Sequence, residues 1–332
     1  MKVLSLFDGI SCGMVALERA GIPVERYVAY EIDPYAIKIS KKNYPNIEHF
    51  GDVTTADFTQ FKGFDLVIGG SPCQGFSFAG KQLNFDDPRS KLFFEFVRAL
   101  EEAKPKYFLF ENVKMKTESR DIISEYLGVD PIAINSSLVS AARRDRTYWT
   151  NIPNVTQPDD KGLLLKDIVR AEDDNNYHLS AKHHAAFLKS YKWKHCNFDE
   201  KAKPLLASYY KQPPHCPYIP CDKSESGFRM LSPIECERLQ TLPDNYTEGI
   251  SKTQRYKCLG NGWTVDVITH ILTNIKNADV DVNAVCRLKA YRRVLTHQQY
   301  QTLKGQILSY NSIGAMKGLD RILQRRKERE RK

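Results

Sequence analysis

Short apolar runs alternate with helical patterns along the first 110 residues, and glycine, proline or an acidic residue follows each run. The runs lie at residues 3–7, 27–30, 49–51, 64–70 and 107–110. Nearly continuous apolar strands separated by helices are typical of a parallel sheet covered on both faces. We therefore expect an α/β fold whose sheet is mostly parallel and whose carboxyl strand ends form one rim.

Five residues suited to binding or catalysis follow these runs in order: Gly9, Glu31, Asp52, Cys73 and Glu111. Ligands of open α/β sheets bind outside the carboxyl ends of the strands. Taken alone, the loop before Cys73 could be an ordinary turn with a buried thiol, and each acid a solvated residue or a helix cap. Their convergence on one rim favours a ligand site with a reactive cysteine.

The first three strand ends favour a nucleoside ligand without phosphate. A glycine turn lets the backbone approach a ligand closely, and the helix start beyond it favours negative charge. Glu31 follows at about the 20-residue spacing of the acid that binds ribose hydroxyls in nucleotide-binding folds. Asp52 is placed to accept from an adenine amino group. The turn lacks the G-x-G-x-x-G pattern and a phosphate-binding lysine, which favours S-adenosylmethionine (AdoMet).

The order of motifs over most of residues 1–275 resembles that of the C5-cytosine DNA methyltransferases. The similar segments are Phe7-Asp8-Gly9 to Gly13, Gly51-Asp52-Val53, residues 71–77 (SPCQGFS), Glu111-Asn112-Val113, Arg144-Asp145-Arg146, residues 229–233 and 235–240, and residues 259–265 (LGNGWTV). Asp8, Trp263 and residues 139–142 are closest to the animal de novo enzymes. Pro72-Cys73-Gln74 and the Gly-Asn-Gly at 260–262 are typical of bacterial members, so we expect a bacterial or phage enzyme. Ala142 and Gly262 stand where many bacterial members have Gln and Ser.

The resemblance implies a Rossmann-like, AdoMet-dependent fold and DNA (cytosine-5-)-methyltransferase activity. It implies that Cys73, Glu111, Arg144 and Arg146 are catalytic. The implied cofactor contacts are Phe7, Asp8, Gly9, Ile10, Gly13, Glu31, Ile32, Asp52, Val53, Ser71, Pro72, Leu92, Asn261, Gly262 and Trp263. No metal is expected, because Cys216 and Cys221 lack a second pair at zinc-ligand spacing.

The implied chemistry begins with the Cys73 thiolate adding to C6 of a cytosine that has rotated out of the duplex. The Arg144 and Arg146 pair is the expected source of a lowered thiol pKa. Glu111 is expected to act in its protonated form on N3, which requires a carboxyl pKa raised by burial.

Residues 76–92 are rich in small and polar side chains and are predicted to form a loop that closes over the flipped base. The expected DNA contacts are Gln74, Ser77, Ala79, Lys81 and Arg89. For Lys81 and Arg89 the alternative is an ordinary solvated loop charge.

Four segments follow from these patterns. We expect a catalytic AdoMet-binding domain at residues 1–152 and a target-recognition domain at 153–228, where basic and aromatic residues interleave. The chain then returns to the catalytic domain at 229–285. A basic helical extension at 286–332 completes it, with helices predicted at 290–307 and 313–323.

The chain of 332 residues has a net charge of +9, which suits a polyanionic partner such as double-stranded DNA. It has no apolar run long enough to span a membrane and no signal-peptide pattern, so we expect a cytoplasmic, nucleoid-associated protein. We expect a monomer with a restriction-modification or phage-protective role, alongside a separate cognate endonuclease if one exists. Two alternatives stay open: a tRNA cytosine-5 methyltransferase on the same scaffold, and a non-catalytic DNA-binding regulator.

Overall fold

The computed structural model of the protein describes residues 1–72, 88–190, 194–277, 287–308 and 319–324. A seven-stranded sheet with the order β3-β2-β1-β4-β5-β7-β6 forms its centre. The strands are β1 (Lys2–Leu6), β2 (Arg26–Tyr30), β3 (Glu48–Phe50), β4 (Leu66–Gly69), β5 (Tyr107–Val113), β6 (Ile132–Asn135) and β7 (Asp145–Thr150). Strands β1 to β5 pair in parallel, and β7 is antiparallel to its neighbours β5 and β6. The prediction of an α/β fold with a mostly parallel sheet is confirmed.

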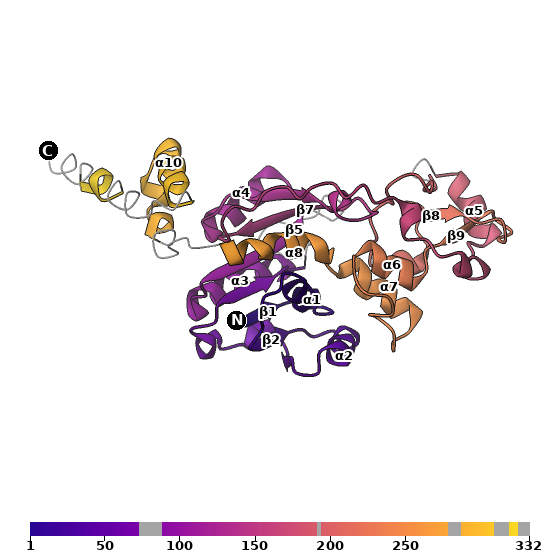
Figure 1. Cartoon of the computed structure of the whole chain (residues 1–332), viewed down its shortest axis with the longest axis horizontal. Helices are drawn as coiled ribbons and strands as arrows, with labels where there is room; N and C mark the ends of the chain where they lie inside the picture. The colour runs from indigo at the N-terminus through magenta and orange to yellow at the C-terminus, as the bar shows by residue number, and fades with distance from the viewer. Residues whose placement is uncertain (73–87, 191–193, 278–286, 309–318, 325–332) are drawn as a thin grey trace.

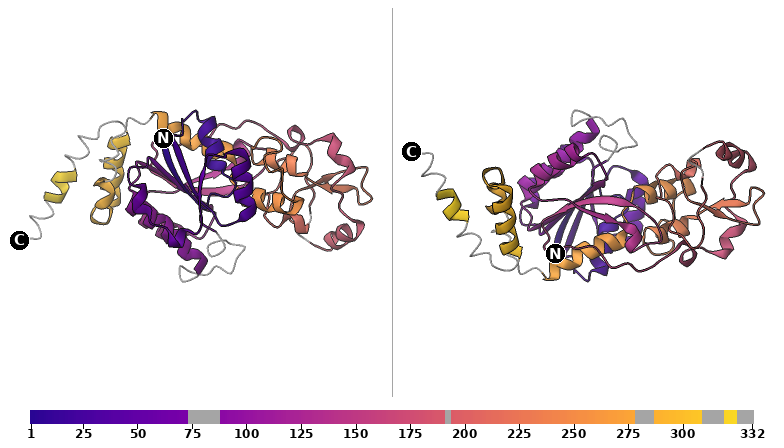
Figure 2. Two further views of the ribbon diagram at one scale, coloured as in Figure 1. Left: turned by 90° about the horizontal axis from the view of Figure 1, so that it is seen from below. Right: turned by 90° about the horizontal axis from the view of Figure 1, so that it is seen from above.

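Helices cover both faces of this sheet (Figures 1 and 2). Alternate residues of β1, β2, β4, β5 and β7 enter two separate apolar clusters, as expected when successive side chains point to opposite faces. One cluster contains residues of α1 (Cys12–Arg19), α2 (Pro34–Asn43) and α8 (Val265–Thr273), and the other contains residues of α3 (Pro88–Ala103) and α4 (Thr117–Leu127). The sheet is therefore buried from both sides, which explains its nearly continuous apolar strands.

A smaller lobe projects from one end of the molecule and contains α5 (Ala181–Leu188), β8 (Tyr218–Pro220) and β9 (Phe228–Met230) (Figure 1). The helices α6 (Pro233–Leu239) and α7 (Lys252–Asn261) lie between this lobe and the sheet. Short 3-10 turns occur at Val53–Thr55, Phe58–Phe61, Ser136–Leu138, Leu165–Asp167, Ala171–Asn175, Tyr209–Lys211, Asn274–Asn277 and Arg292–Val294. The sequence of α6 fixes its start, because Ser232 and Glu235 form a reciprocal capping box with Pro233 at the first helical position.

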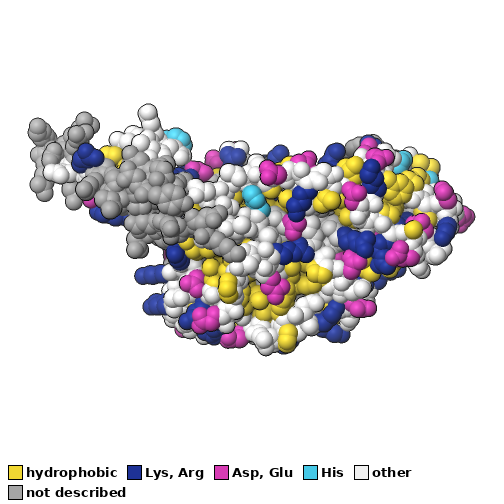
Figure 3. Space-filling view, viewed as in Figure 1, with side chains coloured by type: hydrophobic (Ala, Val, Ile, Leu, Met, Phe, Trp, Pro, Cys, Tyr) yellow, Lys and Arg dark blue, Asp and Glu magenta, His cyan; other side chains and the backbone are white. Residues whose placement is uncertain are grey.

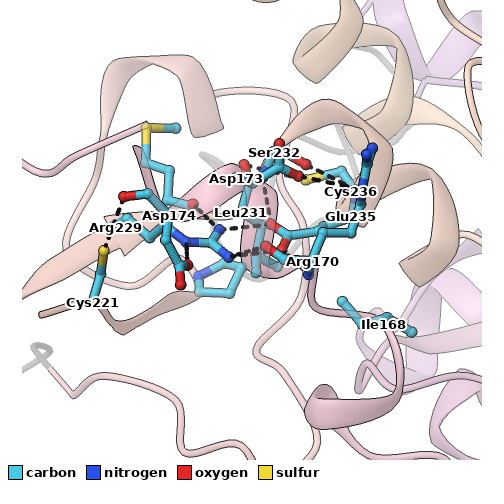
Figure 4. A network of polar contacts seen from close by, with 12 residues as sticks. Ile168, Arg170, Asp173, Asp174, Cys221, Arg229, Leu231, Ser232, Glu235 and Cys236 are labelled. Carbon is cyan, nitrogen blue, oxygen red and sulfur yellow. Dashed lines mark hydrogen bonds and ion pairs between the residues drawn. The ribbon is translucent and has the colours of Figure 1, made fainter. Parts of the chain in front are cut away.

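A buried ionic network ties the lobe to α6 (Figure 4). The Arg229 guanidinium donates to both carboxylate oxygens of Glu235 at 2.8 Å, and both side chains have no exposed surface. Its Nε donates to Asp174 at 2.8 Å. The Glu235 carboxylate also accepts from the backbone N–H groups of Arg170 and Ser232. The pair has no exposed surface and is surrounded by Asp174 and two backbone N–H groups, so this junction is intolerant of losing either charge.

We expect Arg229→Met to destabilise the protein by about 3–5 kcal/mol, because it leaves the Glu235 carboxylate buried without its counter-charge. The matched control is Arg238→Met, which breaks the half-exposed pair with Asp244. That change should cost no more than about 1 kcal/mol. Urea unfolding followed by circular dichroism measures both. An equal loss of unfolding free energy in the two variants would contradict the stabilising role assigned to the buried network.

The single helix predicted over residues 290–307 is wrong. The chain instead makes a turn at Arg292–Val294 and begins α10 (His297–Leu308) afterwards. The break occurs because Thr296 and Gln299 cap each other, each side chain accepting from the other's backbone N–H. Of the second predicted helix, 313–323, the structure describes residues 319–323, which are helical.

The extension docks beside the amino-terminal end of β6 through Asp130, whose carboxylate accepts from Arg292, Gln301 and Lys304. It therefore lies at the end of the molecule away from the lobe of β8 and β9 (Figure 1). On the face seen in Figure 3, Lys and Arg side chains are interspersed with Asp and Glu. Within the described ranges, every helix is too short or too polar to cross a bilayer.

Candidate active site

A cavity of about 390 Å³ opens at the carboxyl ends of β1, β2, β4 and β5. It brings together residues that are far apart in the sequence, as the order of motifs predicts. The predicted site residues that line it are Phe7, Asp8, Gly9, Ile10, Glu31, Ile32, Asp52, Val53, Ser71, Pro72, Leu92, Glu111, Arg144, Arg146, Asn261, Gly262 and Trp263. Four of the five residues expected at the rim, Gly9, Glu31, Asp52 and Glu111, therefore meet at one cavity.

The turn after β1 is held in an unusual backbone conformation. Phe7, Gly9 and Ser11 have φ angles of 57°, 60° and 59°, a region that only glycine enters without strain. Asp8 is fixed within the turn, because its carboxylate accepts from Tyr27 at 2.7 Å and from Ser11 at 2.5 Å. Burial raises the pKa of Asp8, although these hydrogen bonds oppose the effect. Two strained non-glycine residues in one turn are typical of a functional loop.

Glu31 joins this turn to the start of α2. Its Oε2 accepts from the Gly9 N–H, and its Oε1 accepts from the N–H groups of Ile32 and Asp33, all at 2.8 Å. The neighbouring Ile32 side chain is 71 % exposed on the wall of the cavity, although isoleucine is normally buried. An acid beside an exposed apolar surface suits a ribose next to a flat base.

Gly13 is the one predicted cofactor contact that does not line the cavity. A Cβ atom there would lie 2.4 Å from Ile68 Cδ1 and 2.9 Å from the Tyr27 hydroxyl oxygen. The glycine therefore allows α1 to approach the sheet closely. Close packing of α1 on the sheet therefore accounts for glycine at position 13, and no contact with a ligand is needed to explain it.

Glu111 lies within β5 and not after its end, because β7 extends the pairing to Val113 and places Glu111 opposite Tyr148. Its Oε1 forms an ion pair with Arg146 Nε at 2.8 Å, and its Oε2 accepts a hydrogen bond from Trp263 Nε1 at 3.0 Å. The Glu111 side chain is 11 % exposed. The carboxylate is thus held on the cavity wall by one ion pair and one hydrogen bond.

Arg144 and Arg146 have different surroundings, although the sequence pairs them as the source of a lowered thiol pKa. The Arg144 guanidinium is buried and donates to the carbonyl oxygens of Leu205, Gly260 and Gly262 at 3.0–3.1 Å. Two of these contacts join the Arg144 guanidinium to the segment before Trp263, whereas Arg146 forms an ion pair with Glu111. Arg144 therefore braces the cavity wall, and Arg146 is the cation at the carboxylate.

In the sequence, the predicted nucleophile Cys73 directly follows two residues of this wall. Ser71 and Pro72 line the cavity, and the Asn112 amide donates to the backbone carbonyl and the hydroxyl of Ser71, both at 3.4 Å. Cys73 and the predicted DNA contacts Gln74, Ser77, Ala79 and Lys81 lie outside the described residues. Arg89 lies in the first turn of α3 and not in the loop predicted over 76–92.

Several cavity residues were not among the predicted contacts, including Cys12, Cys258 and Gly260. Burial raises the pKa of Cys12 and of Cys258 to about 12 each, so these thiols stay protonated and are poor nucleophiles. A Cβ atom on Gly260 would lie 2.1 Å from the Ala207 nitrogen, so only glycine fits. The place of Gly260 in the Gly-Asn-Gly segment was the sequence signal that could have identified it as a cavity residue.

Comparison with known proteins agrees with this geometry. The family model described as "C-5 cytosine-specific DNA methylase" matches residues 1–127 and 142–277. Type II methyltransferase M1.ScrFI of Lactococcus lactis subsp. cremoris is 31 % identical over 300 residues, which cover 80 % of this chain and 76 % of that protein. Type II methyltransferase M.NlaX of Neisseria lactamica is 28 % identical over 305 residues, covering 83 % of this chain and 96 % of that one.

A solved structure shares the fold. The Entamoeba histolytica methyltransferase EhMeth superposes with a TM-score of 0.72 at 20 % identity, covering 83 % of this chain and 98 % of that one. The identity is low, so this likeness concerns the architecture alone. The extension at 287–324 lies outside the segments that the family model matches.

Proposed function

Because the chain belongs to the family of C-5 cytosine-specific DNA methylases, we propose that it transfers a methyl group from AdoMet to C5 of a flipped cytosine in duplex DNA. Family membership carries the reaction class, which is methylation of cytosine in DNA at C5. The proposal adds the donor, the covalent mechanism and the residues. The observation that supports it most is the meeting of Gly9, Glu31, Pro72 and Glu111 at one cavity.

The cavity fits AdoMet in size and in charge. Its volume lies within the usual range for sites of this kind, about 300–1,000 Å³. The described lining contains no lysine, and its cations Arg144 and Arg146 already have partners. Glu31 is suited to the ribose, Asp52 to the adenine amino group and Ile32 to the face of the base. When bound, AdoMet supplies the electrophilic methyl group that C5 takes up.

The chain's own residues then account for the activation of cytosine. The Cys73 thiolate forms a bond to C6, and the electrons of the C5–C6 double bond move toward N3, where Glu111 delivers a proton. C5 thereby becomes nucleophilic. As C5 takes up the methyl group, the N3 proton returns to Glu111. A base then removes the C5 proton, the C5–C6 double bond re-forms and the thiolate leaves. Arg146 keeps Glu111 facing the base site throughout this sequence.

DNA recognition is assigned to the lobe at residues 153–228. Base flipping costs a few kcal/mol, which contacts to phosphates and base edges must offset. Gln74, Ser77, Ala79, Lys81 and Arg89 are the proposed contacts around the flipped nucleotide. The bacterial relatives are named Type II methyltransferases, which favours a restriction-modification role. The proposal also includes a monomer, acting beside a separate cognate endonuclease if one exists.

A methyl-transfer assay with labelled AdoMet tests the proposal. Duplex DNA should become labelled, and nuclease digestion should show the label as 5-methylcytosine. A matched reaction with tRNA should remain unlabelled. Labelled tRNA with unlabelled DNA would favour the tRNA enzyme, and binding of DNA without turnover would favour the regulator. Bisulfite sequencing of DNA from an expressing host would then identify the recognised sequence.

A further inference from the structure

Trp263 lines the cofactor cavity and also donates a hydrogen bond that lining the cavity does not require. It follows α7 in the sequence, and its indole Nε1 donates to Glu111 Oε2 at 3.0 Å across 152 residues of chain. A phenylalanine would fill a cavity wall in the same way without a donor. We propose that Trp263 is a positioning residue that fixes the Glu111 carboxylate and links it to the cofactor wall, an inference that rests on the proposed function.

The carboxylate is confined on three sides by different elements. Arg146 on β7 holds Oε1, and Trp263 holds Oε2. The backbone after β4 closes the third side, since a Cβ atom on Gly70 would lie 2.8 Å from Oε2 and 3.3 Å from the indole nitrogen. Rotation of the Glu111 side chain would therefore break the ion pair with Arg146 and the hydrogen bond from Trp263.

The chemistry of the indole suits a residue that must lose and regain a proton. An indole N–H can only donate, so it occupies one lone pair of Oε2 whether Glu111 is charged or neutral. The remaining lone pairs stay available to the base. A donor of this kind keeps one orientation of the carboxyl group through the whole reaction.

The backbone that carries Trp263 is itself braced. The carbonyl of the preceding Gly262 accepts from Arg144 at 3.0 Å and from the Gln240 amide at 3.3 Å. The hydroxyl of the following Thr264 donates to Gln240 at 2.8 Å. Arg144 therefore acts on Glu111 through Trp263, because it bonds the backbone that carries the indole.

Trp263→Phe tests this role by removing the N–H donor and keeping an aromatic ring. We expect kcat for DNA methylation to fall about tenfold, the usual effect of one lost hydrogen bond to a charged group. The KM for AdoMet should stay within about twofold. Ile32→Ala, which alters the cavity wall without touching Glu111, should instead raise the KM for AdoMet.

A double-mutant cycle with Glu111→Ala separates positioning from cofactor binding. If Trp263 acts through the carboxylate, adding Trp263→Phe to Glu111→Ala should change the residual single-turnover rate less than about twofold. The inference would be overturned if Trp263→Phe lowered the rate tenfold in both backgrounds. It would also be overturned if the substitution raised the KM for AdoMet and left kcat unchanged.

Gly70→Ala gives a second route that leaves the indole intact. Its methyl group would displace Oε2, so kcat should fall with an unchanged KM for AdoMet. Calorimetric AdoMet binding establishes that each variant is folded. Normal kcat in both Trp263→Phe and Gly70→Ala would overturn the inference, whereas inactivity of the wild-type protein on DNA would overturn the proposed function instead.

Discussion

Cys73→Ser should reduce methyl transfer to DNA by on the order of a thousandfold or more, because a hydroxyl cannot supply the thiolate that adds to C6. The affinity for AdoMet should stay within a few-fold of wild type, since the cofactor-facing residues are unchanged. Single-turnover transfer of a labelled methyl group measures the first quantity, and calorimetry measures the second.

The control for this variant is Cys196→Ser. The Cys196 thiol is buried in the lobe, where burial raises its pKa, and it lies outside the cavity lining. Cys196→Ser should retain transfer within about threefold, because the buried thiol does not line the cavity. Substantial transfer by Cys73→Ser, or an equal loss in both variants, would remove Cys73 from the mechanism.

Glu111→Gln should lower the transfer rate by about a hundred- to a thousandfold while leaving DNA affinity nearly unchanged. The amide cannot deliver a proton to N3. The geometry adds a second cost, because one oxygen of Glu111 pairs with the Arg146 guanidinium and the other accepts from the Trp263 N–H donor. Either orientation of the glutamine turns its NH₂ group toward one of these donors.

Gel-shift titration and single-turnover kinetics on the same duplex separate the two effects of Glu111→Gln. The companion variant Glu111→Asp keeps the acid but shortens the side chain, so its carboxylate cannot reach both Arg146 and Trp263. Its transfer rate should lie between those of wild type and Glu111→Gln. A rate near that of wild type in Glu111→Gln would exclude Glu111 as the proton donor.

The central sheet could be predicted because local patterns determine it. Apolar runs that end at Gly9, Glu31 and Gly70 mark β1, β2 and β4, and the parallel arrangement then brings their carboxyl ends together. The capping box of Ser232 and Glu235 is also a local signal. Such features depend on residues within a few positions of one another.

The features that could not be predicted depend on distant partners. β5 continues to Val113 because β7 pairs with it from more than 30 residues away. Arg144 finds its carbonyl partners at Leu205 and Gly262, and Trp263 finds Glu111, through contacts that no local spacing encodes. The two arginines of one motif therefore looked alike in the sequence and differ in the structure.

Covalent trapping tests the central claim most directly. In 5-fluorocytosine the fluorine replaces the C5 proton, so the adduct cannot eliminate the enzyme after methylation. With AdoMet and a duplex that carries this base in the enzyme's own recognition site, we predict a denaturation-resistant complex whose DNA is attached to Cys73. Absence of that complex under conditions in which the unmodified duplex is methylated would contradict the account.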